Sequence, residues 1–209
     1  TFTAWIHADQ AVLKHGLSAQ AARFETSDQE ITDGVMSGIS FHCAKFNGDG
    51  HIRFDHANFS GDGELNFGLA KFNGNGYLKF DNAEFSGDGG LDFGYAKFTG
   101  DGTLSFNSAK FTGDGNLSFN SAKFNGDGDF NFIEVEFSGD GDLNFYGAEF
   151  SGDSDLDFGL TKFNGDGSLS FNSANFNSDS DLRFYATEFN GDGDVNFDFA
   201  KFIGDSALI

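Results

Sequence analysis

The chain contains no proline, one cysteine, one methionine and one tryptophan among its 209 residues. Because Cys43 is the only cysteine, no intramolecular disulfide can form, which allows a reducing compartment and favours the cytoplasm over secretion. No run of about 18 apolar residues occurs, so the sequence predicts no membrane span. No 3.6-residue hydrophobic period runs through residues 44–209 either, and this excludes a helical repeat in that region.

Basic residues are also scarce, since 12 Lys and Arg face 33 Asp and Glu and give a formal net charge of −21. Such a charge argues against direct binding to nucleic acid or to anionic membranes. It favours solubility, cations or a basic protein as partner. The length fits a single domain.

What the chain does contain is a 13-residue unit that repeats from Ala44 to the last residue, Ile209. Phenylalanines recur with a strict 8-5-8-5 spacing from Phe46 to Phe202, and 25 of the 30 Phe residues lie on this ladder. A second apolar residue precedes each of them by two positions. It is small in one half of the unit and aliphatic in the other. A fixed period of this kind indicates a repeat architecture.

The apolar-x-apolar pattern is that of a short strand with one buried face. Between the two strands of each unit lies a turn such as Asn47-Gly48-Asp49-Gly50, where we expect glycine to supply positive φ and Asp to bond the turn backbone. The other connection, such as Asp55-His56, has only two residues. Strands this short cannot form ordinary hairpins, so we expect each to pair with its copy one coil away, about 4.8 Å along the axis of a solenoid.

Ala-Lys-Phe-Asn-Gly and Leu-Asn-Phe-Gly-Leu each resemble one pentapeptide repeat, and the resemblance covers residues 39–209. The pentapeptide-repeat proteins form a right-handed quadrilateral β-helix with four five-residue faces per coil. The resemblance therefore implies an all-β, right-handed solenoid in which each 13-residue unit supplies two faces. The three-residue insertion at each Gly-Asp-Gly turn departs from the usual twenty-residue coil of that family.

Two coil sizes are compatible with the repeat. One is a 26-residue coil, made of two units and two Gly-Asp-Gly corners, and the other is a 13-residue coil in a flat solenoid of two sheets. Alternate units share residues, as Lys45 and Lys71 do in the first and third units and Ser60 and Ser86 do in the second and fourth. This alternation favours the 26-residue coil, as does the space needed for two aromatic rings per unit.

The two ends of the chain differ from the repeat. Residues 1–21 suggest an amphipathic helix, from near Thr3 to Gly16, that caps the solenoid, and residues 22–43 suggest an irregular first coil before the regular repeat of 44–209. The last unit breaks off at residues 200–209, where a Phe-lined strand edge would pair with another chain. Self-association through this C-terminal edge is therefore one expectation.

An aspartate occupies the centre of nearly every turn, and Asn75 is the single substitute. One account is turn chemistry, because Asp between glycines is a favoured turn residue. The other is a ladder of carboxylates that binds Ca²⁺, since hard oxygen ligands suit this ion. The Ca²⁺ candidates are Asp127, Asp140, Asp153 and Asp166.

Residues 125–161 contain ten acidic residues and no Lys or Arg. A charge run of this kind is usually a solvated face. The resemblance implies an alternative, because some pentapeptide-repeat proteins are acidic rods that occupy the DNA groove of type II topoisomerases and confer quinolone resistance. Besides the four Ca²⁺ candidates, the partner-binding candidates are Asp129, Glu134, Glu136, Asp142, Glu149, Asp155 and Asp157.

Nothing in the sequence indicates catalysis or a cofactor. Serines such as Ser105 recur with the period and face outward, and no Gly-rich turn is followed by a helix that could bind phosphate. The five histidines and Cys43 follow no zinc-ligand spacing. We therefore expect a non-enzymatic scaffold that binds a protein partner or itself. The alternatives are an acidic DNA mimic that binds a topoisomerase and an extracellular filament stiffened by Ca²⁺.

Overall fold

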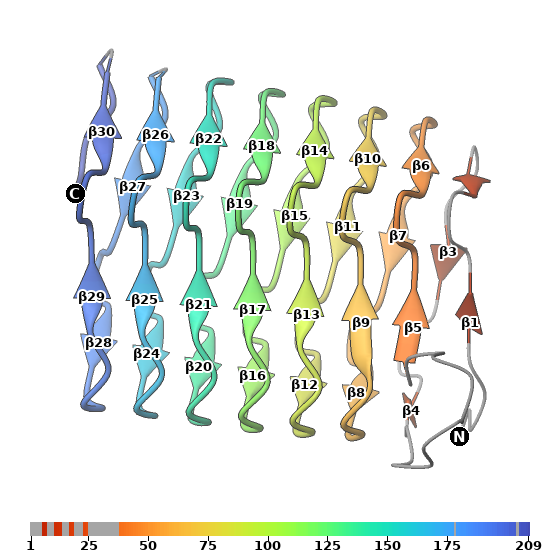
Figure 1. The fold of residues 1–209 in the computed structure, drawn as a ribbon, viewed down its shortest axis with the longest axis horizontal. Helices are drawn as coiled ribbons and strands as arrows, with labels where there is room; N and C mark the ends of the chain where they lie inside the picture. Colours follow the sequence, from red (N-terminus) through yellow and green to blue (C-terminus); the bar gives the residue numbers. More distant parts are fainter. Residues whose placement is uncertain are drawn as a thin grey trace.

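The structure is a computed structural model, which describes residues 6–7, 11–13, 17–18, 23–24, 38–177, 179–203 and 205–209. The described chain forms a right-handed, all-β solenoid of about six coils, with four parallel sheets that run along its axis (Figure 1). Each strand pairs in parallel with the strand four places further along the chain, so that Lys71 lies beside Lys97 and Leu78 beside Leu104. One coil therefore comprises two units, or about 26 residues, and the alternative of a single unit per coil is wrong.

Each sheet is named by its first strand. The β1 sheet contains β1 (Ile6–His7), β5 (Gly38–Ser40), β9 (Glu64–Asn66), β13 (Leu91–Asp92), β17 (Leu117–Ser118), β21 (Leu143–Asn144), β25 (Leu169–Ser170) and β29 (Val195–Asn196). The β2 sheet contains β2 (Val12–Leu13), β6 (Lys45–Phe46), β10 (Lys71–Phe72), β14 (Lys97–Phe98), β18 (Lys123–Phe124), β22 (Glu149–Phe150), β26 (Asn175–Phe176) and β30 (Lys201–Phe202).

The other two sheets complete the four sides of the coil. The β3 sheet contains β3 (Leu17–Ser18), β7 (Ile52–Arg53), β11 (Leu78–Lys79), β15 (Leu104–Ser105), β19 (Phe130–Asn131), β23 (Leu156–Asp157) and β27 (Leu182–Arg183). The β4 sheet contains β4 (Arg23–Phe24), β8 (Asn58–Phe59), β12 (Glu84–Phe85), β16 (Lys110–Phe111), β20 (Glu136–Phe137), β24 (Lys162–Phe163) and β28 (Glu188–Phe189).

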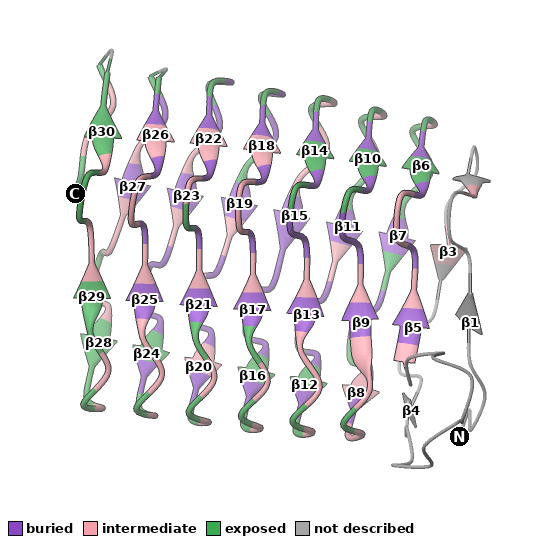
Figure 2. Ribbon diagram, viewed as in Figure 1, coloured by how far each residue is buried: buried purple, intermediate pink, exposed green. Residues whose placement is uncertain are grey.

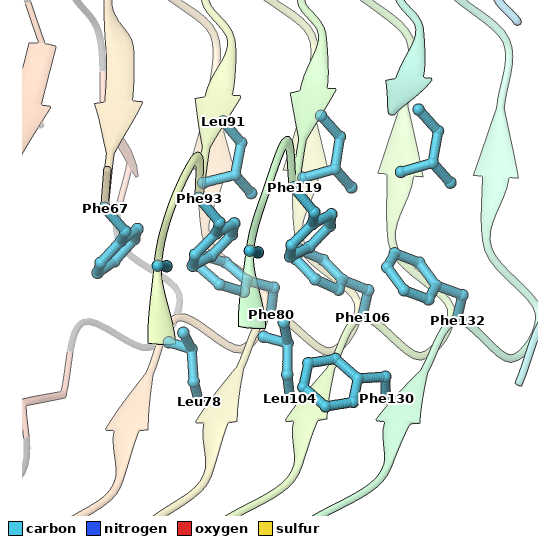
Figure 3. Packing of buried hydrophobic residues seen from close by; sticks show 14 of the residues in the cluster. Phe67, Leu78, Phe80, Leu91, Phe93, Leu104, Phe106, Phe119, Phe130 and Phe132 are labelled. Carbon is cyan, nitrogen blue, oxygen red and sulfur yellow. The ribbon is translucent and has the colours of Figure 1, made fainter. Parts of the chain in front are cut away.

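The core is a set of phenylalanine stacks that follow the axis. Phe67, Phe93 and Phe119 lie one above another with ring centroids 5.0 Å apart and interplanar angles of 5° and 2°. Phe80 and Phe106 belong to the facing stack, with centroids 4.9 Å apart (Figure 3). These rings are fully buried, and burial coloured on the ribbon alternates along the strands, as expected for strands with one inward face (Figure 2). The aromatic ladder therefore points inward, as the sequence predicts.

The turn glycines are required for a reason that differs from our expectation. Positive φ values among the described glycines occur only at Gly38 and Gly147, neither of which lies in a Gly-Asp-Gly turn. Instead, a Cβ atom on a turn glycine would collide with the backbone of the previous coil. At Gly113 it would lie 2.1 Å from the carbonyl oxygen of Gly87. Glycine at Gly113 is thus favoured because the turns stack in backbone contact, whereas Ser154 and Ser180 show that the second turn position also accepts serine.

The left-handed conformation occurs instead at the two-residue corners. Among the residues that the structure describes, twelve other than glycine have φ between 51° and 60°, and they recur once per 13-residue unit, as Cys43, His56 and Leu69 illustrate. In this described series Gly147 alone is a glycine. The left-handed region costs an L-residue roughly 1–2 kcal/mol. The residue type at these corners differs from unit to unit, as Cys43, His56 and Leu69 show, but the backbone of each corner residue is strained in the same way.

The prediction of a helix from near Thr3 to Gly16 is wrong for the residues that the structure describes between these positions. Residues 6–7 and 12–13 are strands, paired with Ile39–Ser40 and Lys45–Phe46 respectively. Their neighbours 1–5, 8–10 and 14–16 lie outside the described residues, as do 22 and 25–37 of the expected first coil. The boundary between a cap at 1–21 and a first coil at 22–43 stays a prediction. In the part of the chain that the structure describes, no helix is long and apolar enough to span a membrane.

Candidate functional site

The Gly-Asp-Gly turns and their variants, such as Gly74-Asn75-Gly76 and Gly152-Asp153-Ser154, form two ridges along the solenoid. The β2–β3 ridge joins the β2 and β3 sheets and carries Asp49, Asn75, Asp101, Asp127, Asp153, Asp179 and Asp205, and the β4–β1 ridge joins the β4 and β1 sheets and carries Asp62, Asp88, Asp114, Asp140, Asp166 and Asp192. Because successive turns stack one coil apart, each ridge presents a row of aspartates with the period of the sheets.

Aspartates of these rows have a structural partner in the next coil. Oδ1 of Asp114 accepts a hydrogen bond from the backbone N–H of Asp140 at 3.0 Å, and Oδ1 of Asp140 accepts one from Asp166 at 3.0 Å. An amide oxygen serves equally well, because Oδ1 of Asn75 accepts the N–H of Asp101 at 3.0 Å. This contact explains why Asp or Asn occupies the position, and it supports the turn-chemistry account of the column.

The four Ca²⁺ candidates do not come together in one site. Asp127 and Asp153 lie on the β2–β3 ridge, whereas Asp140 and Asp166 lie on the β4–β1 ridge. Among the residues with a described placement, no group of three or more His, Cys, Asp or Glu side chains is arranged to hold a metal ion. Ca²⁺ binding by the Asp rows stays a prediction that only a binding measurement can test.

The partner-binding candidates likewise surround the coil instead of sharing one face. Their positions are distributed as follows: Asp129 and Asp155 at the β3 end of the β2–β3 ridge, Glu134 at a corner between the β3 and β4 sheets, Glu136 on the β4 sheet, Asp142 on the β4–β1 ridge, Glu149 on the β2 sheet and Asp157 on the β3 sheet. Two of them bind cations of this chain. Asp155 lies 2.6 Å from Arg183, and Glu149 lies 2.7 Å from Lys123.

Arg183 shows how the acidic surroundings act on a base. Burial would lower the pKa of its guanidinium, but the hydrogen bond to Asp181 and the charges of Asp155 and Asp181 outweigh this effect and raise the pKa above its ordinary value. Nη2 of Arg183 lies 3.0 Å from Asp181. Arg183 therefore stays charged and crosslinks two successive turns.

Charge is divided unequally along the axis, beyond the acidic run predicted at residues 125–161. Residues 38–125 contain 7 basic and 10 acidic residues, a net charge of −3, whereas residues 126–209 contain 3 basic and 18 acidic residues, a net charge of −15. We call these segments the balanced half and the acidic half. Counting charge by coil, instead of over residues 125–161 alone, would have revealed the contrast.

The structure also separates an outward column that appears mixed in the sequence. Lys45, Lys71, Lys97 and Lys123 belong to the β2 sheet, in register with one another. In the β4 sheet the corresponding positions alternate in sign, so that Glu84, Lys110 and Glu136 lie in successive coils. The mixed appearance arises only because consecutive 13-residue units lie on different sheets.

The β1 sheet carries a polar outward row that stabilises its own corner. Oδ1 of Asn66 accepts the N–H of Gly68 at 2.8 Å, and Oδ1 of Asp92 accepts that of Gly94 at 2.7 Å. Beside them, burial raises the pKa of the Glu64 carboxyl; the hydrogen bond from Asn66 lowers it, the charge of Asp92 raises it and that of His42 lowers it, and the net shift is upward.

The described histidines occupy the outside of the coil. His51 and His56 are exposed and His42 is half-buried, whereas His7 and His15 have no described side chains. The His51 ring stacks on Tyr77 with centroids 4.6 Å apart, and its Nδ1 accepts the N–H of Tyr77 at 3.1 Å. Cys43 lies at a left-handed corner.

The last coil leaves inward-type residues uncovered. Phe189, Val195, Phe202 and Leu208 are 46%, 42%, 38% and 55% exposed. The residues at the same positions one coil earlier are 6% exposed or less, and they are Phe163, Leu169, Phe176 and Leu182. We call this end of the described stack the open edge. Its strands β28, β29 and β30 each have a described partner on one side only.

The architecture, with four parallel sheets and 26-residue coils, is consistent with a pentapeptide-repeat fold. No protein-family model matches the chain, and a search of curated proteins gave no match either. The structure therefore identifies the chain at the level of architecture, as a β-solenoid with a repeated coil and a scaffold-type fold.

Proposed function

We propose that the protein is a non-enzymatic scaffold that associates with a second copy of itself. The observation that carries this proposal is the parallel, in-register stacking of its four sheets; at the open edge a second copy would bury Phe189, Val195, Phe202 and Leu208, whose equivalents in the previous coil are covered. Burying a Phe, Val or Leu side chain contributes roughly 1.5–3 kcal/mol. Burial of these four side chains against a second copy would therefore contribute favourable free energy to association.

A second copy fits the open edge because it repeats the same outline. The strands of the solenoid pair in parallel and in register, and β1 to β4 are the first described strands of the same four sheets. A strand edge is a template for another strand of the same spacing, so a second copy in this register can extend the ladders.

The proposal also rests on the in-register stacking of the whole chain. Outward residues such as Lys71 and Lys97 are held one coil apart by ladder hydrogen bonds, for instance from the N–H of Lys97 to the carbonyl of Ala70 at 2.9 Å. A solenoid thus presents its side chains in rows of fixed spacing, which suits extended contacts with a partner. We also propose that the chain is a pentapeptide-repeat protein, on the basis of its four-sided coil and its repeated Phe positions.

Sedimentation equilibrium over a wide concentration range tests the proposal. We expect species larger than one chain, and we expect the double variant Val195→Lys, Phe202→Lys to be monomeric, because lysine on a strand edge prevents edge pairing. The double variant Lys110→Ala, Asn172→Lys is the control, because it alters exposed or half-exposed positions of inner coils. A wild-type protein that is monomeric at every concentration, or an edge variant that associates like the control, refutes the proposal.

The acidic DNA mimic and the Ca²⁺-stiffened filament remain alternatives. Neither is favoured by a specific contact, because the acidic candidates surround the coil and the Asp rows serve the next turn. Relief of quinolone inhibition in a gyrase supercoiling assay would support the first. A melting temperature that Ca²⁺ raises and a chelator restores would support the second.

A further inference from the structure

The row of lysines on the β2 sheet is a feature that folding alone does not explain. Lys45, Lys71, Lys97 and Lys123 lie directly opposite one another in successive strands, which are about 4.8 Å apart. Like charges opposite one another in a sheet are destabilising. The β4 sheet of the same chain avoids this cost by alternating Glu and Lys, so the fold does not impose it.

Among the described residues, an ion pair offsets the charge repulsion for one lysine of the row. Lys123 lies 2.7 Å from Glu149. No carboxylate of a described residue lies within ion-pair distance of Lys45, Lys71 or Lys97, although all three are exposed. Three stacked cations on a protein with a net charge of −21 thus remain available to an anionic partner.

Exposed apolar side chains accompany these lysines. Leu69 and Tyr95 occupy left-handed corners two residues before Lys71 and Lys97, and they are 46% and 61% exposed. Tyrosine is enriched in protein interfaces, and a polar rim around apolar groups is their usual form. We call Leu69, Lys71, Tyr95 and Lys97, together with Lys45, the lysine face.

The acidic half carries a surface of opposite charge on the opposite corner of the coil. Leu160 and Tyr185 lie in successive coils at the corner between the β3 and β4 sheets and are 44% and 76% exposed. Three carboxylates accompany this pair: Glu134 lies one coil before Leu160 in the same column, Glu136 on the β4 sheet and Asp157 on the β3 sheet. Of the described bases nearby, Lys162 pairs with Glu188 at 4.0 Å and Arg183 with Asp155 and Asp181, whereas Lys110 lies opposite Glu136 in the previous coil. We call this surface the acidic corner.

We propose that the lysine face of one copy docks side by side on the acidic corner of a second copy. The two surfaces have opposite charge, and each offers two exposed apolar residues in successive coils. Leu69 and Tyr95 lie one coil apart in the same column, whereas Leu160 and Tyr185 lie in adjacent columns of successive coils, so the two surfaces share the axial repeat distance of the solenoid. The contact brings the balanced half of one copy beside the acidic half of the other and so keeps the two acidic halves apart.

This contact is distinct from end-to-end association at the open edge. The lysine face and the acidic corner lie on different corners of the coil, so the contact is heterologous and leaves one surface of each kind free in a pair. Further copies can therefore add sideways. Salt should affect side-by-side association in two ways. Moderate salt strengthens association because it screens the repulsion between two negatively charged copies. At about 1 M salt, where the Debye length is near 3 Å, the attraction between lysines and carboxylates is also screened and association is lost.

The experiment uses the full chain carrying Val195→Lys and Phe202→Lys, so that failure at the open edge cannot be confused with failure here. Light scattering and sedimentation at about 0.15 M salt should show association that disappears at about 1 M salt. Adding Lys71→Glu and Lys97→Glu should weaken association by about tenfold or more. The control Lys79→Glu, Lys201→Glu makes the same change in net charge outside the lysine face and the acidic corner and should weaken it far less.

Reversing the charges of the two surfaces in separate variants provides the decisive experiment. A chain with Glu134→Lys and Glu136→Lys should also fail to associate alone, and mixing it with the Lys71→Glu, Lys97→Glu chain should restore association. Tyr95→Ser, which places the residue of Ser121 and Ser173 at an equivalent corner, should weaken binding without loss of folding by circular dichroism.

Three results would overturn the proposal. They are a monomer under all these conditions, equal effects of the lysine-face and control variants, and a mixture that stays monomeric. Binding of polyglutamate by a protein that does not associate with itself would assign the lysine face to another acidic partner and would also overturn it.

Discussion

Replacing Gly113 by alanine tests the claim that the turns stack in backbone contact. Gly113 has no left-handed backbone, so the general rule is that Gly→Ala stabilises by about 0.4–1 kcal/mol through the unfolded state. The structure predicts the opposite sign. A Cβ atom at Gly113 would lie 2.1 Å from the carbonyl oxygen of Gly87, where ordinary contact begins at 3.4 Å, so the ridge would have to open by about 1.3 Å.

The cost follows from the hydrogen bonds that such an opening would break. The N–H groups of Thr112 and Gly113 donate to the carbonyl of Phe85 at 2.8 and 3.2 Å. Neither bond tolerates a further stretch of about 1.3 Å, and each contributes about 0.5–1.5 kcal/mol. Overpacking strain of about 1–3 kcal/mol is an independent route to a similar figure. We therefore expect Gly113→Ala to destabilise by about 2–3 kcal/mol.

Urea unfolding followed by circular dichroism measures the difference. Gly90→Ala is the matched control, because a Cβ there would lie 3.2 Å from the carbonyl oxygen of Asn116 and other coils carry Glu, Asn, Asp or Ser in that column. The control should be neutral or stabilised by up to about 1 kcal/mol. If Gly113→Ala proves as stable as Gly90→Ala, backbone contact between turns is not the reason for the glycines.

Three further predictions concern single side chains, each checked by equilibrium unfolding. Asp114→Asn should be neutral, because an amide oxygen still accepts the N–H of Asp140, whereas Asp114→Ala should lose about 1 kcal/mol; equal losses would contradict the Asp-row account. Ser121→Gly should stabilise by about 0.5–1 kcal/mol by relieving its left-handed φ of 55°, and destabilisation would argue against strain at the corners. The raised pKa of Glu64 means that the folded state holds its proton more tightly than the unfolded chain. Stability should therefore fall as pH rises from 4.5 through the folded value, and Glu64→Gln should remove this dependence; an unchanged profile would refute it.

The sequence could predict the axis of the molecule because one physical requirement repeats without exception. Burying a Phe every eight and five residues fixes which side of each short strand faces inward, and Phe67, Phe80 and Phe93 are indeed fully buried. The alternation of Lys45 and Lys71 with Ser60 and Ser86 was enough to choose 26-residue coils. Local composition and pattern thus agree with the architecture.

The remaining features depend on contacts between coils, which no local pattern reports. Glycine in a turn has two uses, positive φ and close approach, and only the position of Gly87 above Gly113 distinguishes them. Tyr95 adopts the left-handed conformation although nothing in its side chain favours it, because the corner is determined by the sheets on both sides. The amphipathic pattern near Val12 was interpreted as a helix, yet Val12 pairs with Lys45 as an added strand.

The equivalence of the two halves of a coil constrains how such a chain can change in length. Removing one 13-residue unit would leave the Phe stacks continuous, since the β2 and β4 sheets have the same inward residues, but every later outward row would move to the other side of the coil. Removing two consecutive units would preserve both the interior and the exterior. Deletions and duplications are thus tolerated by the core in steps of one unit, whereas a functional surface survives only in steps of two. Evolution of this molecule by unequal recombination should therefore favour whole coils.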